Sequence, residues 1–253
     1  MLLELNNVTA GYDGTAVIHN IDFTVSRGDF IGIIGPNGGG KTTLLKVILG
    51  ILKPYKGTIK LNNELTDIRS KKIGYLPQYN NFDRKFPVTV RDIVLSGFIT
   101  RNGLLKHYSA DEKARANMLM EEMGIEKLRN ISASELSGGQ VQRALLCRAL
   151  ASDPEMIILD EPNTYVDNQF EHELYKKLKQ LNQEGKAILL VTHDVGTVSY
   201  YIKSIACVNE TLVYHPSNII TEEQMAAYNC PLQLITHGDI PHTVLKKHDQ
   251  NHE

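Results

Sequence analysis

The sequence predicts an α/β fold with a mostly parallel, helix-covered sheet, an N-terminal antiparallel β subdomain and an inserted helical lobe. Largely apolar runs at Phe30–Ile34, Met156–Asp160 and Ala187–Val191 are typical of parallel strands buried on both faces. Helical periodicity follows the first two runs, and alternation of strand and helix favours a parallel sheet with helices on its faces. From about residue 79 to residue 152 the chain has few β-branched runs, which predicts the lobe.

The length, charge and cysteine content of the chain exclude several classes of protein. The chain has 253 residues, a formal net charge of −2 and a pI near 6.5, so nucleic acid is not an expected partner. Cys147, Cys207 and Cys230 are too few and too scattered for a disulfide framework or a Cys-x-x-Cys metal site, which favours reduced thiols in a cytosolic protein. The N-terminus lacks a secretory pattern, and no apolar run is long enough to cross a bilayer.

The N-terminal part begins with short strands separated by turns. The expected elements are strands at Leu2–Val8, Ile21–Val25 and Phe30–Ile34, a turn at Gly11–Gly14, and a helix at Lys41–Leu49 that directly follows a glycine-rich loop. Further strands are expected at Gly57–Leu61 and Ile73–Leu76.

The lobe carries clear helix signals. Ser109 and Glu112 have capping-box spacing, and Gly124 is expected to end the helix that they begin. Ala116, Leu119, Met120 and Met123 lie at i, i+3, i+4 and i+7, which predicts core packing rather than a ligand site. After the lobe helix at Gly138–Ala151, strands are expected at Met156–Asp160, Ala187–Val191, Ile205–Val208 and Leu212–Tyr214.

The glycine-rich loop predicts a phosphate-binding site. Gly35-Pro36-Asn37-Gly38-Gly39-Gly40-Lys41-Thr42, followed by Thr43, has the G-x-x-x-x-G-K-[ST] spacing between a strand and a helix, which is the context of a P-loop NTPase. Glycines let backbone N–H groups converge on an anion, Lys41 reaches the outer phosphates, and the Thr42 hydroxyl reaches Mg²⁺. ATP and Mg²⁺ are therefore the expected ligands; a glycine-rich hairpin is the alternative.

Two strand ends supply candidate catalytic groups. Asp160, at the end of a hydrophobic strand, is expected to help hold Mg²⁺, which leaves the adjacent Glu161 to orient the attacking water and accept its proton. His193, at the end of a neighbouring strand, is expected to donate to the γ-phosphate. The alternatives are a solvated strand terminus for the two carboxylates and a buried, satisfied imidazole for His193.

A second motif completes the pattern. Leu136-Ser137-Gly138-Gly139-Gln140 resembles the signature of ABC ATPases, and the likeness to ATPase subunits of ABC transporters covers residues 1 to about 230. The resemblance implies a head-to-tail dimer of two such chains, in which Ser137–Gln140 contact the nucleotide held by the partner. It also implies that Tyr12 stacks on adenine, that Gln78 links Mg²⁺ and the water to the lobe, and that Asp167 crosses the dimer interface. Turn filler is the alternative for Tyr12.

Two positions depart from the family pattern. Tyr165 stands where the family has a small residue or Leu, which affects how the two subunits seat and hence the interface role of Asp167. Gly39 stands where relatives more often have Ser, Ala or Cys, which is expected to loosen the loop slightly without removing a hydrogen-bond donor.

The likeness extends to a branch of the family. Phe86–Val94 and Gly50–Pro54 look like the zinc and manganese importers, and the polar tail at 231–253 holds His237, His242, His248 and His252 with Asp239. Imidazoles and a carboxylate suit Zn²⁺ or Mn²⁺, but their spacings match no standard site, so a solvated terminus is the alternative.

The branch likeness implies a function and a set of partners. The expected protein is a cytoplasmic ATPase, peripheral on the inner face of the cell membrane, that works with integral permease subunits and an extracytoplasmic substrate-binding protein. Its ATPase domain is expected at residues 1–230. An iron-chelate importer, a soluble ABC ATPase of iron–sulfur cluster assembly and a P-loop kinase of small molecules are the alternatives, although the kinase leaves Leu136–Gln140 without a purpose.

Overall fold

The computed structural model describes residues 1–62, 64–65, 73–78, 87–98, 107–162, 168–192, 200–218, 232–236 and 241–245. The chain divides into two compact units. Unit 1 contains Met1–Val25, Phe30–Ile68 and Val191–Glu253, and unit 2 contains Ser26–Asp29 and Arg69–Leu190.

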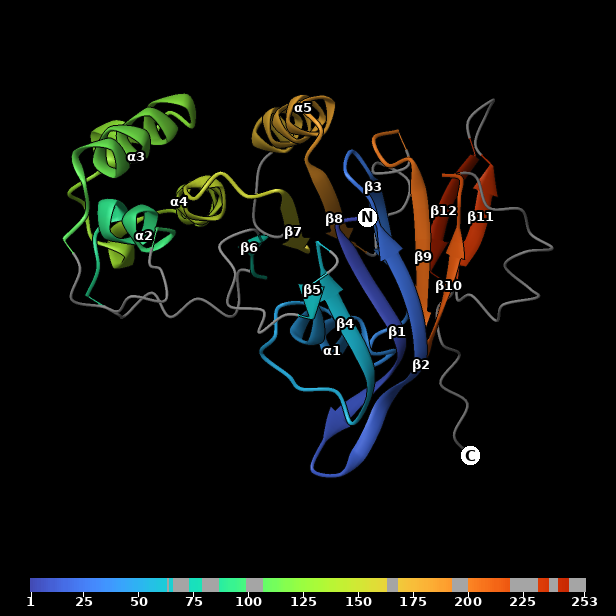
Figure 1. Ribbon diagram of the computed structural model, residues 1–253. Coiled ribbons are helices and arrows are strands. Elements are labelled where there is room, and N and C mark those ends of the chain that lie inside the picture. The colour runs from blue at the N-terminus through green and yellow to red at the C-terminus, as the bar shows by residue number, and fades with distance from the viewer. Residues whose placement is uncertain are drawn as a thin grey trace, which may run out of the picture. The chain divides into compact units, whose positions relative to one another are not determined.

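Unit 1 is mostly β-structure. Its elements are β1 (Leu3–Tyr12), β2 (Thr15–Val25), β3 (Phe30–Ile34), α1 (Lys41–Ile48), β4 (Lys56–Leu61), β5 (Glu64–Leu65), β9 (Ser204–Asn209), β10 (Thr211–His215), β11 (Leu232–Thr236) and β12 (Pro241–Leu245). One sheet has the order β2-β1-β4-β5 with antiparallel pairs throughout, and Figure 1 shows β1, β2 and β4 side by side. The predicted antiparallel β subdomain is therefore confirmed.

The first hairpin is longer than its sequence suggested. β1 continues to Tyr12 and β2 begins at Thr15, so the turn consists of Asp13 and Gly14 rather than Gly11–Gly14. Both turn residues have left-handed backbones, with φ of 50° and 80°. A two-residue turn with this backbone conformation matches the twist of the two strands, so the strands pair as far as the residues next to the turn. Tyr12 is consequently a strand residue, not part of the turn.

Unit 1 also holds β3, β9 and β10, which belong to a second sheet. β3 pairs with β9 in parallel and β9 with β10 in antiparallel, and all five residues of β3 are buried, as the apolar run predicted. Phe23 of β2 packs against Tyr214 of β10, with ring centroids 6.3 Å apart. Two strands not predicted from the sequence, β11 and β12, pair as an antiparallel hairpin within the C-terminal tail.

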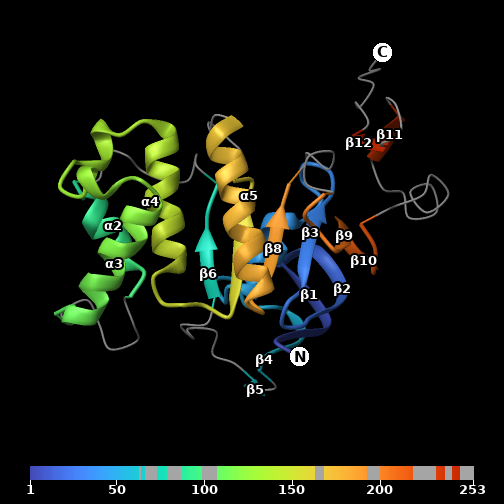
Figure 2. The ribbon, with the colours of Figure 1, turned by 90° about the horizontal axis from the view of Figure 1, so that it is seen from above.

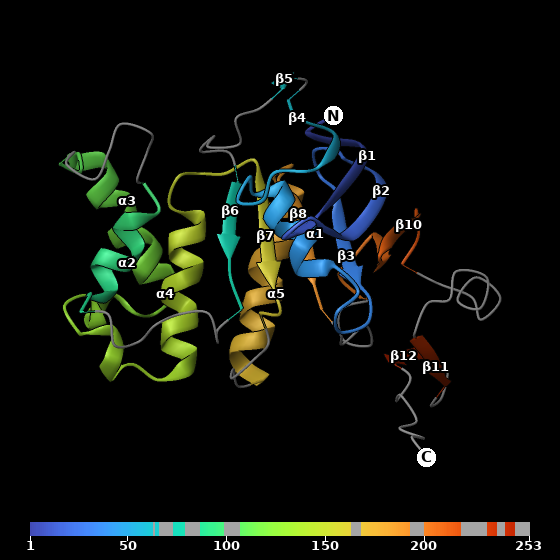
Figure 3. The same cartoon turned by 90° about the horizontal axis from the view of Figure 1, so that it is seen from below.

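Unit 2 contains helices α2 to α5 and the strands β6, β7 and β8. Its elements are β6 (Ile73–Leu76), α2 (Val90–Ser96), α3 (Ala110–Glu122), the 3₁₀ turns η2 (Glu126–Leu128) and η3 (Ala133–Glu135), α4 (Gly138–Leu150), β7 (Met156–Asp160), α5 (Asn168–Gln183) and β8 (Ala187–Val191). β6 and β7 pair in parallel, and α2, α3 and α4 group together as the predicted lobe, as Figures 2 and 3 show.

Local signals in the lobe act as predicted. Ser109 and Glu112 form a reciprocal capping box at the start of α3, and Thr89 and Asp92 form another at the start of α2. The stripe from Ala116 to Met123 is buried, which confirms its core role. Gly124 has φ of 66°, the left-handed conformation that ends a helix.

A buried amide stabilises the region where α5 leads into β8. Asn182 is 6% exposed, and its Nδ2 lies 3.0 Å from the carbonyl oxygens of Gly28, Asp29 and Lys186. Because these carbonyls belong to two separate stretches of unit 2, the single side chain ties those stretches together.

Cys147 agrees with the prediction of reduced thiols. It is a free, buried cysteine; Cys207 is also buried, and Cys230 lies outside the described residues. Burial raises the pKa of the Cys147 thiol to about 12, so that thiol stays protonated and unreactive.

Candidate functional site

The glycine-rich loop connects β3 to α1 in unit 1. Gly38 and Gly40 have φ of 81° and 97°, conformations that strain any residue with a side chain. A Cβ on Gly40 would also lie 2.4 Å from Cγ2 of Ile18, so both backbone and space require glycine immediately before α1. The loop therefore delivers the chain to the first turn of α1, where unpaired N–H groups and the helix dipole favour an anion.

Lys41 places a positive charge inside this loop. Its ammonium donates to the carbonyl oxygens of Gly35 and Pro36, both at 2.9 Å, and the residue is 8% exposed. Thr42, next in the chain, is exposed, whereas Thr43 is buried. A buried ammonium beside an exposed hydroxyl is the donor arrangement expected for the outer phosphates of a nucleotide and its metal.

Gly39 is packed more tightly than the sequence analysis expected. A Cβ there would lie 2.9 Å from the carbonyl oxygen of Val208 and 3.0 Å from the Pro36 ring, and the Gly39 carbonyl accepts from the N–H of Glu210. Glycine at this position thus permits a close approach between the loop and the β9–β10 turn.

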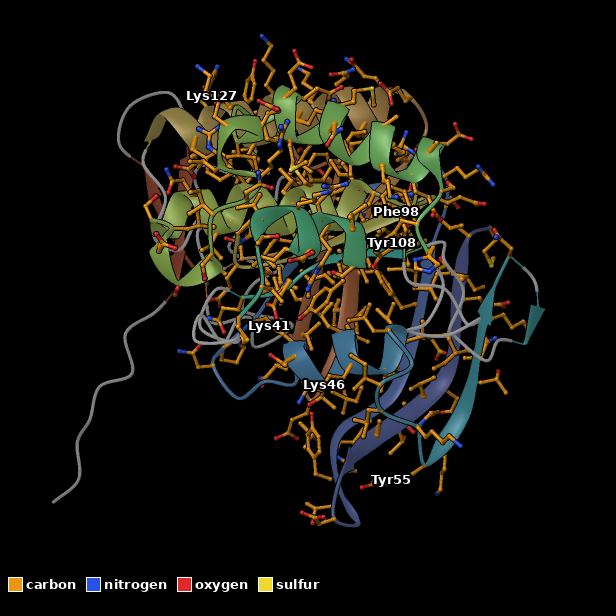
Figure 4. All side chains as sticks on the ribbon, turned by 90° about the vertical axis from the view of Figure 1, so that its left-hand side faces the viewer. Lys41, Lys46, Tyr55, Phe98, Tyr108 and Lys127 are labelled. Atoms are coloured by element: carbon orange, nitrogen blue, oxygen red, sulfur yellow. The ribbon has the colours of Figure 1, made fainter. Side chains whose placement is uncertain are left out.

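An exposed aromatic ring lies at the end of β1. Tyr12 is 40% exposed, and Lys46 of α1 places its Nζ 5.1 Å from the ring centroid. Tyr55 supports the hairpin, because its hydroxyl accepts from the N–H of Gly14 at 3.2 Å. Figure 4 labels Lys41, Lys46 and Tyr55 in this part of unit 1. The ring is thus held at a defined place while remaining open to solvent.

Unit 2 brings together the predicted carboxylates and the glutamine. Asp160, the last residue of β7, is 5% exposed, and the Tyr75 hydroxyl donates to its Oδ2 at 3.5 Å. Burial, reinforced by the Asp160 charge, raises the pKa of Tyr75 to about 12, so Tyr75 remains a donor at neutral pH. Gln78 donates from Nε2 to Oε2 of Glu161 at 2.7 Å. Glu161 itself has φ of 49°, a strained conformation for a residue with a side chain.

The signature segment begins helix α4. Ser137 is its N-cap: the hydroxyl accepts from the N–H of Gln140 at 3.3 Å, and the Gln140 side chain accepts from the N–H of Ser137 at 2.9 Å. Gly138 and Gly139 follow as the first helical residues, and a Cβ on Gly139 would meet nothing within 4 Å. The segment therefore presents the start of a helix with no side chain over Gly139.

Some of the predicted site residues lie outside the described part of the chain, and two residues of the site were not predicted. Outside the described residues lie His193, Tyr165, Asp167, Asp239 and the tail histidines His237, His248 and His252. Tyr75, which contacts the Asp160 carboxylate, and Gln142, which contacts the backbone after Glu161, were not predicted, because neither stands within a motif. The only sequence signal for Tyr75 is its place three residues before Gln78 on the same strand end.

Comparison with known proteins assigns the family. The family model described as ABC transporter matches residues 18–164. The chain belongs to the ABC transporter family. As an ATPase of this family it binds nucleotide, and such cassettes function as pairs with membrane permease subunits. Within the part of the chain that the structure describes, no helix combines the length and apolar character that spanning a bilayer requires.

The relatives of this ABC ATPase include metal transport proteins. The zinc uptake system ATP-binding protein ZurA of Listeria innocua is 39% identical over 220 residues, which cover 85% of this chain and 86% of ZurA. The manganese transport system ATP-binding protein MntB of Halalkalibacterium halodurans is 37% identical and covers 89% of this chain and 90% of its own length. A solved structure of a putative metal-chelate type ABC transporter in an inward-facing conformation has a TM-score of 0.79 at 26% identity, covering 98% of each chain.

Proposed function

We propose that this chain is the ATP-hydrolysing subunit of an importer for a divalent metal ion, zinc or manganese. The observation that carries the substrate class is the 39% identity to a zinc uptake protein over 85% of this chain. The importer would consist of two copies of the chain, a pair of membrane permease subunits and an extracytoplasmic substrate-binding protein. The chain would work at the cytoplasmic face of the membrane, with residues 1–230 as the ATPase domain and the lobe at about 79–152 inserted in it.

The groups that bind ATP lie in unit 1. The loop N–H groups and the Lys41 ammonium would hold the phosphates, because the loop leads into the N-terminus of α1 and the ammonium lies against the loop carbonyls of Gly35 and Pro36. The Tyr12 ring would stack on adenine through its open face. Gly38 and Gly40 of the loop have the positive φ that lets a backbone approach a phosphate closely.

Mg²⁺ fits the donor atoms available. The Thr42 hydroxyl, the Asp160 carboxylate and the Gln78 amide oxygen would hold it, and these are the hard oxygen ligands that Mg²⁺ prefers. Gln78 uses Nε2 for Glu161, so its oxygen is the end left for a metal. When bound, the ion would offset the negative charge of the transferred phosphoryl group.

Glu161 is the proposed general base. Its carboxylate is fixed by Gln78 at 2.7 Å and is adjacent to Asp160 without being required as a metal ligand. A carboxylate in that position would orient a water molecule and accept its proton, and His193 would donate to the γ-phosphate. Ser137, Gly138, Gly139 and Gln140 would contact the nucleotide of the second copy, and Asp167 would cross the interface between the copies.

Uptake in cells tests the substrate, and a trapped dimer tests the mechanism. Deletion of the coding region should abolish high-affinity zinc or manganese uptake. The wild-type chain should restore that uptake, and the Lys41→Ala variant should not. Loss of iron-chelate uptake instead of zinc or manganese uptake would contradict the proposal. Glu161→Gln should lower hydrolysis by about a hundredfold or more and trap an ATP-bound dimer. Near-normal hydrolysis by Glu161→Gln would exclude Glu161 as the base.

A further inference from the structure

A buried glutamine in the signature helix lies beside the proposed base. Gln142 of α4 is 2% exposed, and its Nε2 donates to the carbonyl oxygen of Pro162, the residue that follows Glu161. The two partners are 20 residues apart in sequence and both belong to unit 2. A side chain from α4 thus contacts the backbone directly after the carboxylate.

This arrangement carries two energetic penalties that a packing role leaves unexplained. Among the described residues, the Oε1 atom of Gln142 has no hydrogen-bond partner although it is buried. An apolar side chain of similar length would fill the same space without that penalty. Glu161 has a left-handed backbone with φ of 49°, which persists only where surrounding groups enforce it.

We infer that Gln142 is a positioning residue for the reaction: it fixes the Pro162 carbonyl and so holds the Glu161 backbone in the conformation that presents the carboxylate. Two hydrogen bonds then constrain the base from separate elements, because Gln78 holds its side chain and Gln142 holds the adjoining peptide. The inference rests on the proposed role of Glu161 as the base.

The same contact joins the signature to the base. The N-cap of α4 is Ser137, whose proposed partner is the nucleotide of the second copy, and Gln142 lies five positions after Ser137 on this helix. A short, continuous helix transmits small displacements, so the seating of the partner's phosphate on Ser137 would adjust the carbonyl beside Glu161. Gln142 thereby links the helix that serves one nucleotide to the backbone that follows the base serving the other, through the Pro162 carbonyl.

The test compares hydrolysis by Gln142→Met, Glu161→Gln and the double variant in the assembled transporter. Gln142→Met keeps length and burial but removes the donor. We expect kcat to fall about ten- to a hundredfold because the base is misplaced, while KM for ATP stays within about twofold. In the Glu161→Gln background the same change should alter residual single-turnover hydrolysis by less than about twofold, since the group it positions is already gone.

Asn182→Leu is the matched control, since it also removes a buried amide donor from unit 2 but lies at the α5–β8 connection. It should lower thermal stability without a selective loss of kcat per folded molecule. Should Gln142→Met fail to fold, Gln142→Asn takes its place, since it keeps the amide but is one methylene too short to make the contact.

The outcomes separate the inference from the function on which it rests. Gln142→Met activity within twofold of wild type, or an equal loss in both backgrounds, would overturn the role of Gln142 even if Glu161→Gln is inactive. Normal hydrolysis by Glu161→Gln would instead overturn the assignment of the base, and the inference with it.

Discussion

Replacing Gly139 by alanine should separate the stability of the fold from its activity. Gly139 is the second residue of α4, its φ is not left-handed, and a Cβ would meet nothing within 4 Å. Alanine loses less backbone entropy than glycine in a helix, so the free energy of unfolding should rise by about 0.5 kcal/mol. For a chain of this length that increase corresponds to a melting temperature about 1–2 °C higher.

Activity should move in the opposite direction. If the start of α4 contacts the partner's γ-phosphate, a methyl group at this point would hold the phosphate oxygens beyond hydrogen-bond distance of the backbone N–H groups. Loss of such a donor lowers turnover by about a hundredfold. ATPase assays of the assembled transporter and thermal unfolding of the chain would measure the two effects.

Gly124→Ala provides the crossed control for Gly139→Ala. Gly124 is equally open, since a Cβ there would meet nothing within 4 Å, but its φ is 66°, so alanine at this position is strained. We expect a loss of about 1 kcal/mol of stability with unchanged turnover per folded molecule. Wild-type hydrolysis by Gly139→Ala would refute the reasoning, because the surface at Gly139 would then contact nothing during turnover.

Three further predictions concern stability. Asn182→Leu leaves backbone carbonyls without their donor and should cost about 2–4 kcal/mol, lowering the melting temperature by roughly 5–15 °C. Gln180→Leu on the same helix, where the amide is exposed, should change stability by less than about 0.5 kcal/mol, and equal losses would contradict the assigned role of Asn182. Thr89→Ala removes the N-cap of α2 and should cost about 1 kcal/mol in urea unfolding, whereas no change would show that packing alone fixes this helix. Burial lowers the pKa of His215 below 6.5, so the unfolded chain takes up the proton first and the free energy of unfolding should fall as pH drops below about 6.5. In His215→Gln, the midpoint of urea unfolding should depend less on pH between pH 7.5 and 5. An unchanged pH dependence would exclude His215 as its cause.

The buried strands were predictable because burial on both faces leaves a direct trace in the sequence. Phe30–Ile34, Met156–Asp160 and Ala187–Val191 have the bounds that their apolar runs indicated. The β1–β2 hairpin was less predictable, since its strands have one solvated face and polar residues such as Asn7 and Asn20 interrupt the alternation. Turn chemistry at Asp13 and Gly14, rather than hydrophobicity, sets where those strands end.

The candidate site divides in the same way. Lys41, Asp160 and Ser137 belong to motifs whose spacing is imposed by local backbone geometry, so a linear pattern contains them. The contacts of Gln142 and Lys46 depend on the tertiary structure. Each residue lies on a predictable helix, but the residue that it contacts belongs to another element, whose packing against that helix is not visible in a linear pattern. Sequence reasoning assigned neither residue a role, because a polar residue on a helix ordinarily indicates a solvated face.

The backbone of Glu161 shows why a functional residue can oppose local preference. At Gly40 the left-handed conformation coincides with glycine, because the loop needs no side chain there and space excludes one. At position 161 the chain adopts a similar conformation with a glutamate, although glycine would be less strained. The strained backbone at Glu161 is consistent with a functional role for its carboxylate, provided that neighbouring groups hold the backbone in place. Gln78 and Gln142 are placed to do so, which is why removing either donor should affect turnover before it affects the fold.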